Sequence, residues 1–373
     1  MKPIIDLVAG ARPNFMKLAP VARALRAHPE VGFRVVHTGQ HYDASMTDVF
    51  FEELDIPAPE VHLDVGSGSH GAQTARIIER YEAHLLERRP AASVVFGDVN
   101  STVACALAAV KLGVPVAHVE AGLRSFDRSM PEEINRLLTD AIADLLLVSE
   151  PSGLANLKRE GVDASKIRLV GNVMIDTLLS QLPAARERCV TARLGLDGTA
   201  YGFITLHRPS NVDDASTLAV LLRLFSELAQ RMPLVFAVHP RTVAAAKRMN
   251  LESLITGGQR DLICLGPQPY LDSLSLLAGA AVVLTDSGGL QEESSALHVP
   301  CLTLRENTER PVTLTLGTSR LVGNAPSRIR AAFDDVLDGR WPMGQAIPLW
   351  DGMAGPRVAA ELAAWVTRPV CVP

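Results

Sequence analysis

The sequence predicts an α/β protein with two doubly wound, Rossmann-like domains that face a cleft. The chain has 373 residues, a length that favours about two domains. Short runs of apolar, β-branched residues alternate with helical stretches, and this alternation starts again in the second half of the chain. Strands that alternate with helices form right-handed βαβ units, so each domain should hold a parallel sheet covered on both faces.

In the first half of the chain, each expected strand is a short apolar run, and helical stretches follow these runs. The expected strands cover residues 4–10, 33–39, 93–99, 114–122 and 144–150. The expected helices cover residues 15–28, 46–54, 101–113 and 153–161.

The second half repeats this pattern after an expected hinge over residues 167–179. Residues 171–172 and 181–188 interrupt the pattern, which places the boundary between the domains near residues 170–185. We therefore expect a first domain over residues 1–172, a second over residues 173–354, and a helix over about residues 355–368 that packs back on the first. The expected strands of the second domain cover residues 201–208, 234–240, 261–266 and 280–289.

Composition excludes several classes of protein. The 36 Lys and Arg against 41 Asp and Glu residues give a formal net charge of -5, without the basic surface that nucleic-acid binding needs. The five cysteines are scattered without a CxxC spacing, which excludes a disulfide framework and a zinc site and fits a reducing compartment. Asp6 interrupts the apolar N-terminal run, and no segment reaches the roughly 18 apolar residues of a membrane helix. We expect a cytoplasmic protein with no nucleic-acid or membrane partner.

Many ionisable residues follow the expected strands. In open α/β sheets, ligands bind beyond the carboxyl ends of the strands, so these residues are candidates for a functional site. Ordinary loop exposure is the competing explanation for any one of them. The set comprises Arg12, His37, Asp98, Glu120, His207, His239 and Asp286.

The string LTDSGGLQEE indicates a cradle for a nucleotide diphosphate. Ser287, Gly288 and Gly289 lie between an expected strand and an expected helix. Glycines there let the backbone approach an anion, and the free amides of the helix start favour phosphate. Glu293, inside the helix, could bind a ribose diol. The competing explanation is a glycine-rich turn capped by Asp286 or Ser287.

Two carboxylates, Asp98 and Glu120, end successive expected strands. Like charges at one end of a sheet push their pKa values apart, which is how acid and base roles are divided. Glu132 and Arg136 follow at i,i+4 spacing, which suits either a surface ion pair or an oriented catalytic pair. Taken alone, Asp98 would serve equally well as the N-cap of the following helix.

Cations lie at the start of the first expected helix. Arg12 lies in the loop and Lys17 in the first helical turn. Positive charge there opposes the helix dipole, so both residues favour a bound phosphate or a nearby carboxylate. A solvated basic pair is the competing explanation.

His207 and His239 end two strands of the second domain, and an arginine lies shortly after each of them. Histidine titrates near neutral pH and arginine binds phosphate through two hydrogen bonds, so a diphosphate leaving group could be held and protonated here. Either histidine alone could be structural. HExxH and GxGxxG patterns are absent, so neither a metal nor a redox cofactor is expected.

Eight motifs lie along the chain from about Pro3 to Gly323, and they are GARPNFMKLAP, FGDVNST, HVEAGLRSFDRSMPEEINR, GNVMID, TLHRPSNV, VHPRT, LTDSGGLQEE and ENTERP. In combination they resemble the non-hydrolysing UDP-N-acetylglucosamine 2-epimerase family. The resemblance implies a GT-B-like fold, a homodimer, and interconversion of UDP-N-acetylglucosamine and UDP-N-acetylmannosamine without a cofactor.

The resemblance also implies roles for single residues. Asp98, Glu120 and Glu132 would be the acid/base and positioning carboxylates, and His207 would help the diphosphate to depart. Gln40, His41 and Gln73 lie in stretches similar to a site for a second, activating UDP-N-acetylglucosamine, or else line the sugar end of the active site. The residues that bind the substrate or orient the acids would be Arg12, Lys17, Arg136, His239, Tyr270, Ser287, Gly288, Gly289 and Glu293.

The chain departs from the family pattern at two nucleotide contacts. Ser210 stands where many members have a glutamate in HRxEN, and Ser273 stands where an aromatic residue is frequent. Tyr270 could stack on the uracil instead. The substrate therefore stays open between UDP-N-acetylglucosamine and a UDP-2,3-diacetamido uronic acid. Three further hypotheses compete with both of these, namely a hydrolysing 2-epimerase, a GT-B glycosyltransferase and a silent nucleotide-sugar sensor.

Overall fold

The computed structural model describes residues 2–39, 51, 53–256 and 261–368 of the chain, so the helix expected over residues 46–54 lies almost wholly outside it. The chain divides into two compact units. Unit 1 comprises Met1–Thr177 and Pro348–Pro373, and unit 2 comprises Leu178–Ile347. The first division therefore falls after Thr177, whereas the sequence analysis expects it after residue 172.

Unit 1 is built on a parallel sheet of seven strands. The strands are β1 (Ile4–Ala9), β2 (Gly32–His37), β3 (Val61–His62), β4 (Ala92–Phe96), β5 (Val116–Ala121), β6 (Leu145–Val148) and β7 (Ile167–Leu169). Their order in the sheet is β3-β2-β1-β4-β5-β6-β7. Every residue of β4, β5 and β6 is buried, as expected for a parallel sheet with helices on both faces.

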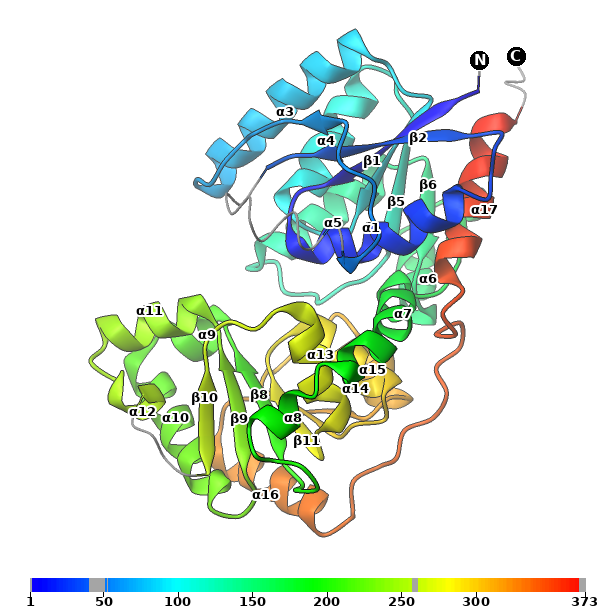
Figure 1. The fold of residues 1–373 in the computed structure, drawn as a ribbon. Coiled ribbons are helices and arrows are strands. Elements are labelled where there is room, and N and C mark those ends of the chain that lie inside the picture. The colour runs from blue at the N-terminus through cyan, green and yellow to red at the C-terminus, as the bar shows by residue number, and fades with distance from the viewer. Residues whose placement is uncertain (1, 40–50, 52, 257–260, 369–373) are drawn as a thin grey trace. The chain divides into compact units, whose positions relative to one another are not determined.

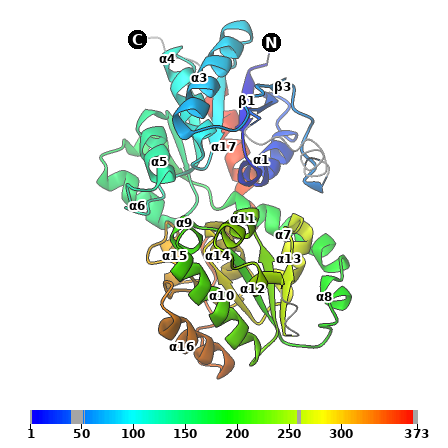
Figure 2. The same cartoon turned by 90° about the vertical axis from the view of Figure 1, so that its left-hand side faces the viewer.

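The helices of unit 1 cover both faces of this sheet. Within the described residues they are α1 (Arg12–Leu25), α3 (His70–Glu87), α4 (Asn100–Lys111), α5 (Pro131–Ile142), α6 (Pro151–Arg159), the short η1 (Ala164–Lys166), the start of α7 (Val173–Glu187) and α17 (Ala354–Thr367). Because right-handed crossovers leave β1 and β4 in opposite directions, α1 and α4 cover opposite faces. The red helix α17 lies along α1 (Figure 1), and α3 lies beside α4 (Figure 2).

Unit 2 repeats the design with six parallel strands. They are β8 (Gly202–Leu206), β9 (Leu234–Val238), β10 (Leu262–Leu265), β11 (Val282–Thr285), β12 (Cys301–Thr303) and β13 (Ser319–Leu321), in the order β10-β9-β8-β11-β12-β13. The helices are the rest of α7, α8 (Val190–Arg193), α9 (Pro209–Val212), α10 (Ala215–Ala229), α11 (Pro240–Arg248), α12 (Ser253–Thr256), α13 (Tyr270–Gly279), α14 (Gly288–Ala296), α15 (Pro311–Thr315) and α16 (Pro326–Leu337).

Two apolar clusters form the core of unit 2, one on each face of its sheet. Ile204 and Leu206 of β8 join the cluster under α10, α11 and α16, and α10 packs against α16 (Figure 2). Phe203 points to the opposite face and joins the cluster under α7, α8, α13 and α14. Side chains of one strand therefore pack into both clusters, because successive side chains of a strand point to opposite faces.

The two doubly wound sheets confirm the predicted fold class. In each sheet the strand order reverses between two neighbours, which are β1 and β4 in unit 1 and β8 and β11 in unit 2. Ligands of open α/β sheets bind beyond the carboxyl ends of the strands at such a reversal. The fold itself therefore selects two small groups of residues, one in each unit.

Helix α7 corrects one interpretation of the sequence. The stretch 181–188 is expected to interrupt the pattern, but α7 runs from Val173 to Glu187 with Pro183 inside it. Leu178 and Ala185 of this helix are fully buried in the core of unit 2. A proline removes one helical hydrogen bond, and burial of the apolar side of the helix outweighs that loss.

Candidate functional site

Asp98 and Glu120 lie at neighbouring strand ends in unit 1, as predicted. Asp98 follows β4 after one glycine, and Glu120 is the penultimate residue of β5. The two strands pair directly, with Phe96 opposite Val119. The chain therefore brings two carboxylates to one edge of the sheet, next to the reversal between β1 and β4.

A buried lysine from α1 pairs with Glu120. The Nζ atom of Lys17 forms an ion pair with Glu120 Oε2, and the side chains are only 9% and 5% exposed. Gly97 makes room for this pair: a Cβ atom on it would lie 2.6 Å from Lys17 Nζ, and its φ is +63°. Lys17 lies in the second turn of α1 rather than the first, and a carboxylate explains its charge as the sequence analysis proposed. The competing explanation of a solvated lysine is wrong.

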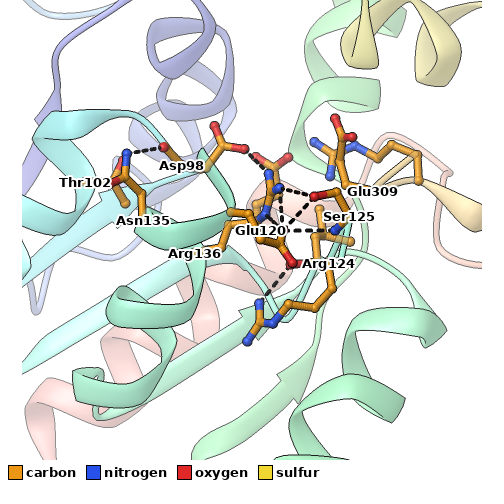
Figure 3. Close-up of polar contacts among 12 residues, drawn as sticks. Asp98, Thr102, Glu120, Arg124, Ser125, Asn135, Arg136 and Glu309 are labelled. Carbon is orange, nitrogen blue, oxygen red and sulfur yellow. Dashed lines mark hydrogen bonds and ion pairs between the residues drawn. The ribbon is translucent and has the colours of Figure 1, made fainter. Parts of the chain in front are cut away.

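Asp98 has a different cationic partner, Arg136 of α5 (Figure 3). Arg136 is 2% exposed and also binds Glu133, with Nη2 2.6 Å from Glu133 Oε2. Glu133 in turn accepts hydrogen bonds from the backbone N–H groups of Ser125 and Phe126, both at 2.9 Å. Burial alone would raise the pKa of Glu133, but these N–H groups and Arg136 lower it.

These contacts correct two predictions. Arg136 pairs with Glu133 at i,i+3 and with Asp98, rather than with Glu132 at i,i+4. Asp98 is not a helix cap, because Val99 occupies the N-cap position of α4 and its side chain makes no capping hydrogen bond. Glu132 is half-buried, and its side chain forms no hydrogen bond or ion pair with any residue that the structure describes. Its carboxylate is thus held by neither of the cations that hold Asp98 and Glu120.

Asn14 is a polar residue at this edge that the sequence analysis missed. Its Nδ2 donates to the carbonyl of Phe96 at 2.8 Å, and its Oδ1 accepts from the N–H of Ala11 at 3.1 Å. It therefore ties the start of α1 to the end of β4, across the reversal in strand order. Asn14 is the third residue of α1, where a polar side chain that accepts from the N-cap backbone N–H is a signal for a helix start. Arg12 begins α1, but its side chain lies outside the described part of the structure.

In unit 2, His207 and Asp286 meet across the reversal between β8 and β11. The Nδ1 atom of His207 lies 2.8 Å from Asp286 Oδ1, and the side chains are 33% and 0% exposed. Asp286 also accepts from the backbone N–H groups of His207 and Arg208 and from Asn211 Nδ2. Burial would raise the pKa of Asp286, but the hydrogen bonds from His207, Asn211 and Arg208 lower it. An ionised Asp286 therefore orients the His207 ring through Nδ1 and leaves Nε2 for chemistry.

His239 has a structural role that the sequence analysis left open. Its Nδ1 accepts from the N–H of Arg241 at 3.1 Å and thereby caps α11. Its ring centroid is 5.3 Å from that of His207. Burial first, and then the charge of His207, lowers the pKa of His239. A neutral His239 adds no positive charge beside His207. Arg241 pairs with exposed Asp213 at 2.7 Å.

The DSGG string forms the strand-to-helix turn that was predicted. Ser287 is the N-cap of α14, and its hydroxyl accepts from the N–H of Leu290 at 3.5 Å. A Cβ atom on Gly288 would lie 2.6 Å from Glu309 Oε1, so a larger residue there would displace the Glu309 carboxylate. The nearest atom to a Cβ on Gly289 would be Ser287 Oγ at 4.0 Å. Gly289 thus keeps an open space at the positive end of the helix dipole.

This geometry predicts opposite effects for two alanine substitutions. Gly289→Ala should fold and should be more stable by about 0.5–1 kcal/mol, because alanine favours a helix. It should nevertheless weaken UDP binding about 10-fold, because its methyl group would fill the space next to the free N–H groups at the start of α14. Gly288→Ala should lower the melting temperature, since its Cβ would displace Glu309. Isothermal titration with UDP and thermal unfolding measure both effects. A Gly289→Ala variant with unchanged UDP affinity would exclude this turn as the phosphate site.

Glu293, one turn into α14, is a buried acid with an unusual pKa. It is 6% exposed, and Tyr270 Oη donates to its Oε1 at 3.0 Å. Burial raises the pKa of Glu293 to about 7, and the hydrogen bond from Tyr270 opposes that shift. Burial also raises the pKa of Tyr270 well above its ordinary value, with a further contribution from Glu293. The two residues that were assigned to ribose and uracil are thus hydrogen-bonded to each other.

The pKa of Glu293 predicts a pH-dependent stability. Between its ordinary pKa of 4.5 and about 7, the folded chain keeps a proton that the unfolded chain releases, so stability falls as pH rises. Each pKa unit corresponds to about 1.4 kcal/mol. From pH 5 to pH 8, the unfolding free energy of wild type should therefore fall by about 3 kcal/mol relative to that of Glu293→Gln. Urea denaturation at the two pH values measures this. Glu227→Gln, at an exposed carboxylate paired with Arg330, is the control, and an equal gain there would contradict the assignment to Glu293.

Two buried ion pairs beside α14 were also missed by the sequence analysis. Arg305 Nη2 lies 2.8 Å from Glu309 Oε2, and Arg310 Nε lies 2.8 Å from Glu292 Oε1. All four side chains are less than 10% exposed. The i,i+4 spacing in RENTER was the available signal for the first pair. Because Glu309 also packs against Gly288, these pairs fix the position of the turn.

Among the residues assigned to an activator site, only Gln73 lies within the described part of the chain, and Gln40 and His41 lie outside it. Gln73 belongs to α3, and its Oε1 accepts from Asn100 Nδ2 at 2.8 Å. Asn100 begins α4 two positions after Asp98.

Among the described residues, no helix is long and apolar enough to cross a membrane. The same residues contain no group of three His, Cys, Asp or Glu side chains that could hold a metal ion.

Comparisons with known proteins show what this chain is similar to. The family model for UDP-N-acetylglucosamine 2-epimerase matches residues 23–363. A UDP-N-acetylglucosamine 2-epimerase of Methanocaldococcus jannaschii is 40% identical over 366 residues, which cover 96% of this chain and 98% of that protein. A UDP-2,3-diacetamido-2,3-dideoxy-D-glucuronate 2-epimerase of Pseudomonas aeruginosa is also 40% identical, with 95% and 98% covered.

A solved structure is similar over almost the whole chain. The crystal structure of Methanocaldococcus jannaschii UDP-GlcNAc 2-epimerase in complex with UDP-GlcNAc and UDP matches with a TM-score of 0.89 at 39% identity. The match covers 97% of this chain and 99% of that one. The fold is therefore GT-B-like, as the resemblance implied.

Proposed function

Because the chain belongs to the UDP-N-acetylglucosamine 2-epimerase family, we propose that it interconverts UDP-N-acetylglucosamine and UDP-N-acetylmannosamine reversibly, without hydrolysing either. The observation that carries this proposal is the pair of carboxylates at adjacent strand ends, Asp98 and Glu120, each held by its own cation. Inversion at a carbon needs one group to remove a proton and another to deliver one from the opposite face. A glycosyltransferase would use the nucleotide cradle but has no need of this pair.

In the proposed reaction, UDP leaves and then returns. One carboxylate takes the proton from carbon 2 while the bond between carbon 1 and the diphosphate oxygen breaks, and the electron pair of the carbon–hydrogen bond forms the double bond of a glycal. The diphosphate oxygen then adds back to carbon 1, and a second group protonates carbon 2 on the other face. The assignment of base and acid between Asp98 and Glu120 stays open, and Glu132 is the third candidate.

The departure of UDP needs stabilisation of the diphosphate charge. The proton on carbon 2 is only weakly acidic, so much of the driving force comes from groups that receive the leaving group. We assign this role to the amides at the start of α14 with Ser287, Gly288 and Gly289, and to His207 through its Nε2. Asp286 supports His207 because an aspartate on Nδ1 fixes the orientation of the ring.

The remaining assignments rest on the same geometry. Arg136 and Lys17 orient Asp98 and Glu120, since each is in direct contact with its carboxylate. Glu293 and Tyr270 are assigned to the nucleoside, His239 to the support of His207, and Arg12 to an anionic part of the substrate. We further propose a homodimer, which sedimentation velocity tests directly, and a second UDP-sugar site that includes Gln73.

A second substrate is supported by the relative from Pseudomonas aeruginosa. That protein is a UDP-2,3-diacetamido-2,3-dideoxy-D-glucuronate 2-epimerase, and its identity to this chain equals that of the archaeal UDP-N-acetylglucosamine 2-epimerase. Both substrates would undergo the same elimination and addition at carbons 1 and 2. The carboxylate pair therefore supports the reaction type for both, and the sugar is the part that experiment must select.

The test is proton NMR of the purified protein with each UDP-sugar in deuterated water. We expect deuterium to enter carbon 2 while the epimer accumulates to a fixed ratio. Free N-acetylmannosamine with UDP would instead identify a hydrolysing enzyme. Exchange with the diacetamido uronic acid donor alone would assign that sugar as the substrate, and exchange with neither would overturn the proposed function.

A further inference from the structure

A histidine in the core of unit 1 joins the two strands that carry the carboxylates. His118 lies in β5 and is 0% exposed. Its Nε2 atom is 2.8 Å from the carbonyl oxygen of Gly97, the residue between β4 and Asp98. Its Nδ1 atom is 2.6 Å from Asp140 Oδ1 on α5. One ring therefore connects the end of β4, the end of β5 and the helix that also carries Arg136.

The hydrogen-bond partners of His118 show where one of its ring protons lies. A carbonyl oxygen only accepts, so Nε2 of His118 donates to Gly97. Nδ1 and the carboxyl of Asp140 then share one further proton. Burial would raise the pKa of Asp140, but His118 and Arg124 lower it. Both ring nitrogens of His118 are thus held in hydrogen bonds.

Asp140 also holds the chain on the far side of Glu120. Its Oδ2 accepts from the N–H of Gly122 at 3.0 Å and from Arg124 Nη1 at 2.7 Å. Glu120 lies between His118 and Gly122, which both hydrogen-bond to Asp140, and its φ is +75°. The pairing of β5 with β6 is irregular between Val119 and Ala121. A positive φ is unfavourable for glutamate, and such strain persists only where the surroundings fix it.

We propose that His118 is a positioning residue for Asp98 and Glu120. His118 bonds to the carbonyl of Gly97, next to Asp98, and to Asp140. Asp140 in turn holds the irregular part of β5 that contains Glu120. Through these contacts His118 sets the relative position of the two carboxylates. This inference rests on the proposed function, in which both groups address one carbon. A misplacement of about 1 Å between reacting groups costs about 10²-fold in rate, whereas binding of the nucleotide by unit 2 does not depend on it.

Two substitutions separate the two hydrogen bonds of His118. Asparagine places its amide near the Nδ1 position and glutamine places its amide near the Nε2 position. We expect His118→Asn, which loses the bond to Gly97, to lower kcat for carbon 2 exchange about 10²-fold while KM stays within about 3-fold. His118→Gln keeps a donor to Gly97 and should lower kcat less than about 10-fold.

The control is a second buried histidine of unit 1. His84 is 8% exposed, and its Nε2 lies 2.9 Å from Asp6 Oδ2 on β1, inside the sheet rather than at its carboxyl edge. His84→Asn should lower the melting temperature and leave kcat unchanged. Equal losses of kcat in His84→Asn and His118→Asn would show a general effect of buried histidines and overturn the proposal, as would a wild-type kcat in His118→Asn.

A spectroscopic arm is independent of turnover. In the protein labelled with 15N-histidine, Nε2 of His118 should carry a proton that is protected from solvent exchange. An Nε2 without a proton would overturn the bridge between the strands. If the wild-type enzyme exchanges carbon 2 of neither UDP-sugar, the proposed function is overturned. If the wild-type enzyme and His118→Asn exchange carbon 2 at the same rate, only the positioning role is overturned.

Discussion

Glu120→Gln is expected to lower turnover about 10³-fold while UDP affinity stays within about 3-fold. General acid or base catalysis contributes about 10²–10⁴-fold to a rate, and glutamine keeps the shape of glutamate without its proton-transfer capacity. Asp98→Asn should have a similar effect, because the proposed inversion needs both groups. UDP affinity should be kept because the turn proposed to hold the nucleotide belongs to unit 2. The readouts are carbon 2 exchange by NMR and UDP titration by calorimetry.

Glu133→Gln is the matched control for Asp98→Asn. Both substitutions remove one carboxylate from Arg136, but Glu133 contacts the backbone of Ser125 and Phe126 rather than the strand edge. We expect Glu133→Gln to lower the melting temperature and to keep kcat within about 10-fold. For Glu120→Gln, circular dichroism must show a folded protein, since the change leaves Lys17 without its buried partner. Wild-type exchange rates in both Asp98→Asn and Glu120→Gln would contradict the proposed roles.

The positions of Asp98 and Glu120 could be predicted because parallel sheets follow simple rules. Each residue ends a short apolar run, and the carboxyl ends of neighbouring parallel strands meet at one edge. The same rules place His207 and Asp286 beside the reversal between β8 and β11. The fold class needed no side-chain detail, because alternation of strands and helices selects the doubly wound sheet.

The partners of these residues could not be predicted, because helix spacing does not choose between competing contacts. Glu132 and Glu133 both lie within about one turn of Arg136, and the choice of Glu133 depends on the backbone of Ser125, which lies outside the helix. Lys17 finds Glu120 only once α1 has packed beside the sheet. Such choices depend on tertiary contacts that no local pattern records.

His118 shows a further limit of sequence reasoning. In the string VAHVEAG, its side chain alternates with its neighbours like any buried residue of a central strand. The sequence offers no sign that Asp140, on another element, completes its hydrogen bonds. A buried polar residue in a parallel strand is unusual, and this alone could have marked it for attention.

Asp286→Asn is expected to lower kcat about 10²-fold with a small effect on UDP affinity. The asparagine amide can accept only through one oxygen, whereas Asp286 accepts from His207 Nδ1, two backbone N–H groups and Asn211. Loss of an aspartate that orients a catalytic histidine leaves the ring in a less favourable orientation and tautomer, which in a related arrangement costs about 10⁴-fold. We expect a smaller loss here because the backbone N–H groups still hold the turn.

Asn211→Ala is the control for Asp286→Asn. It removes another donor to the same carboxylate, at 3.0 Å from Asp286 Oδ2, without touching His207. Asn211 also donates to the carbonyl of Leu304 at 2.9 Å. Its loss should therefore lower the melting temperature and have little effect on kcat. If both variants lose kcat equally, Asp286 supports only the local fold. If Asp286→Asn alone loses kcat while keeping its melting temperature and UDP affinity, the aspartate acts on the departure of the diphosphate through His207.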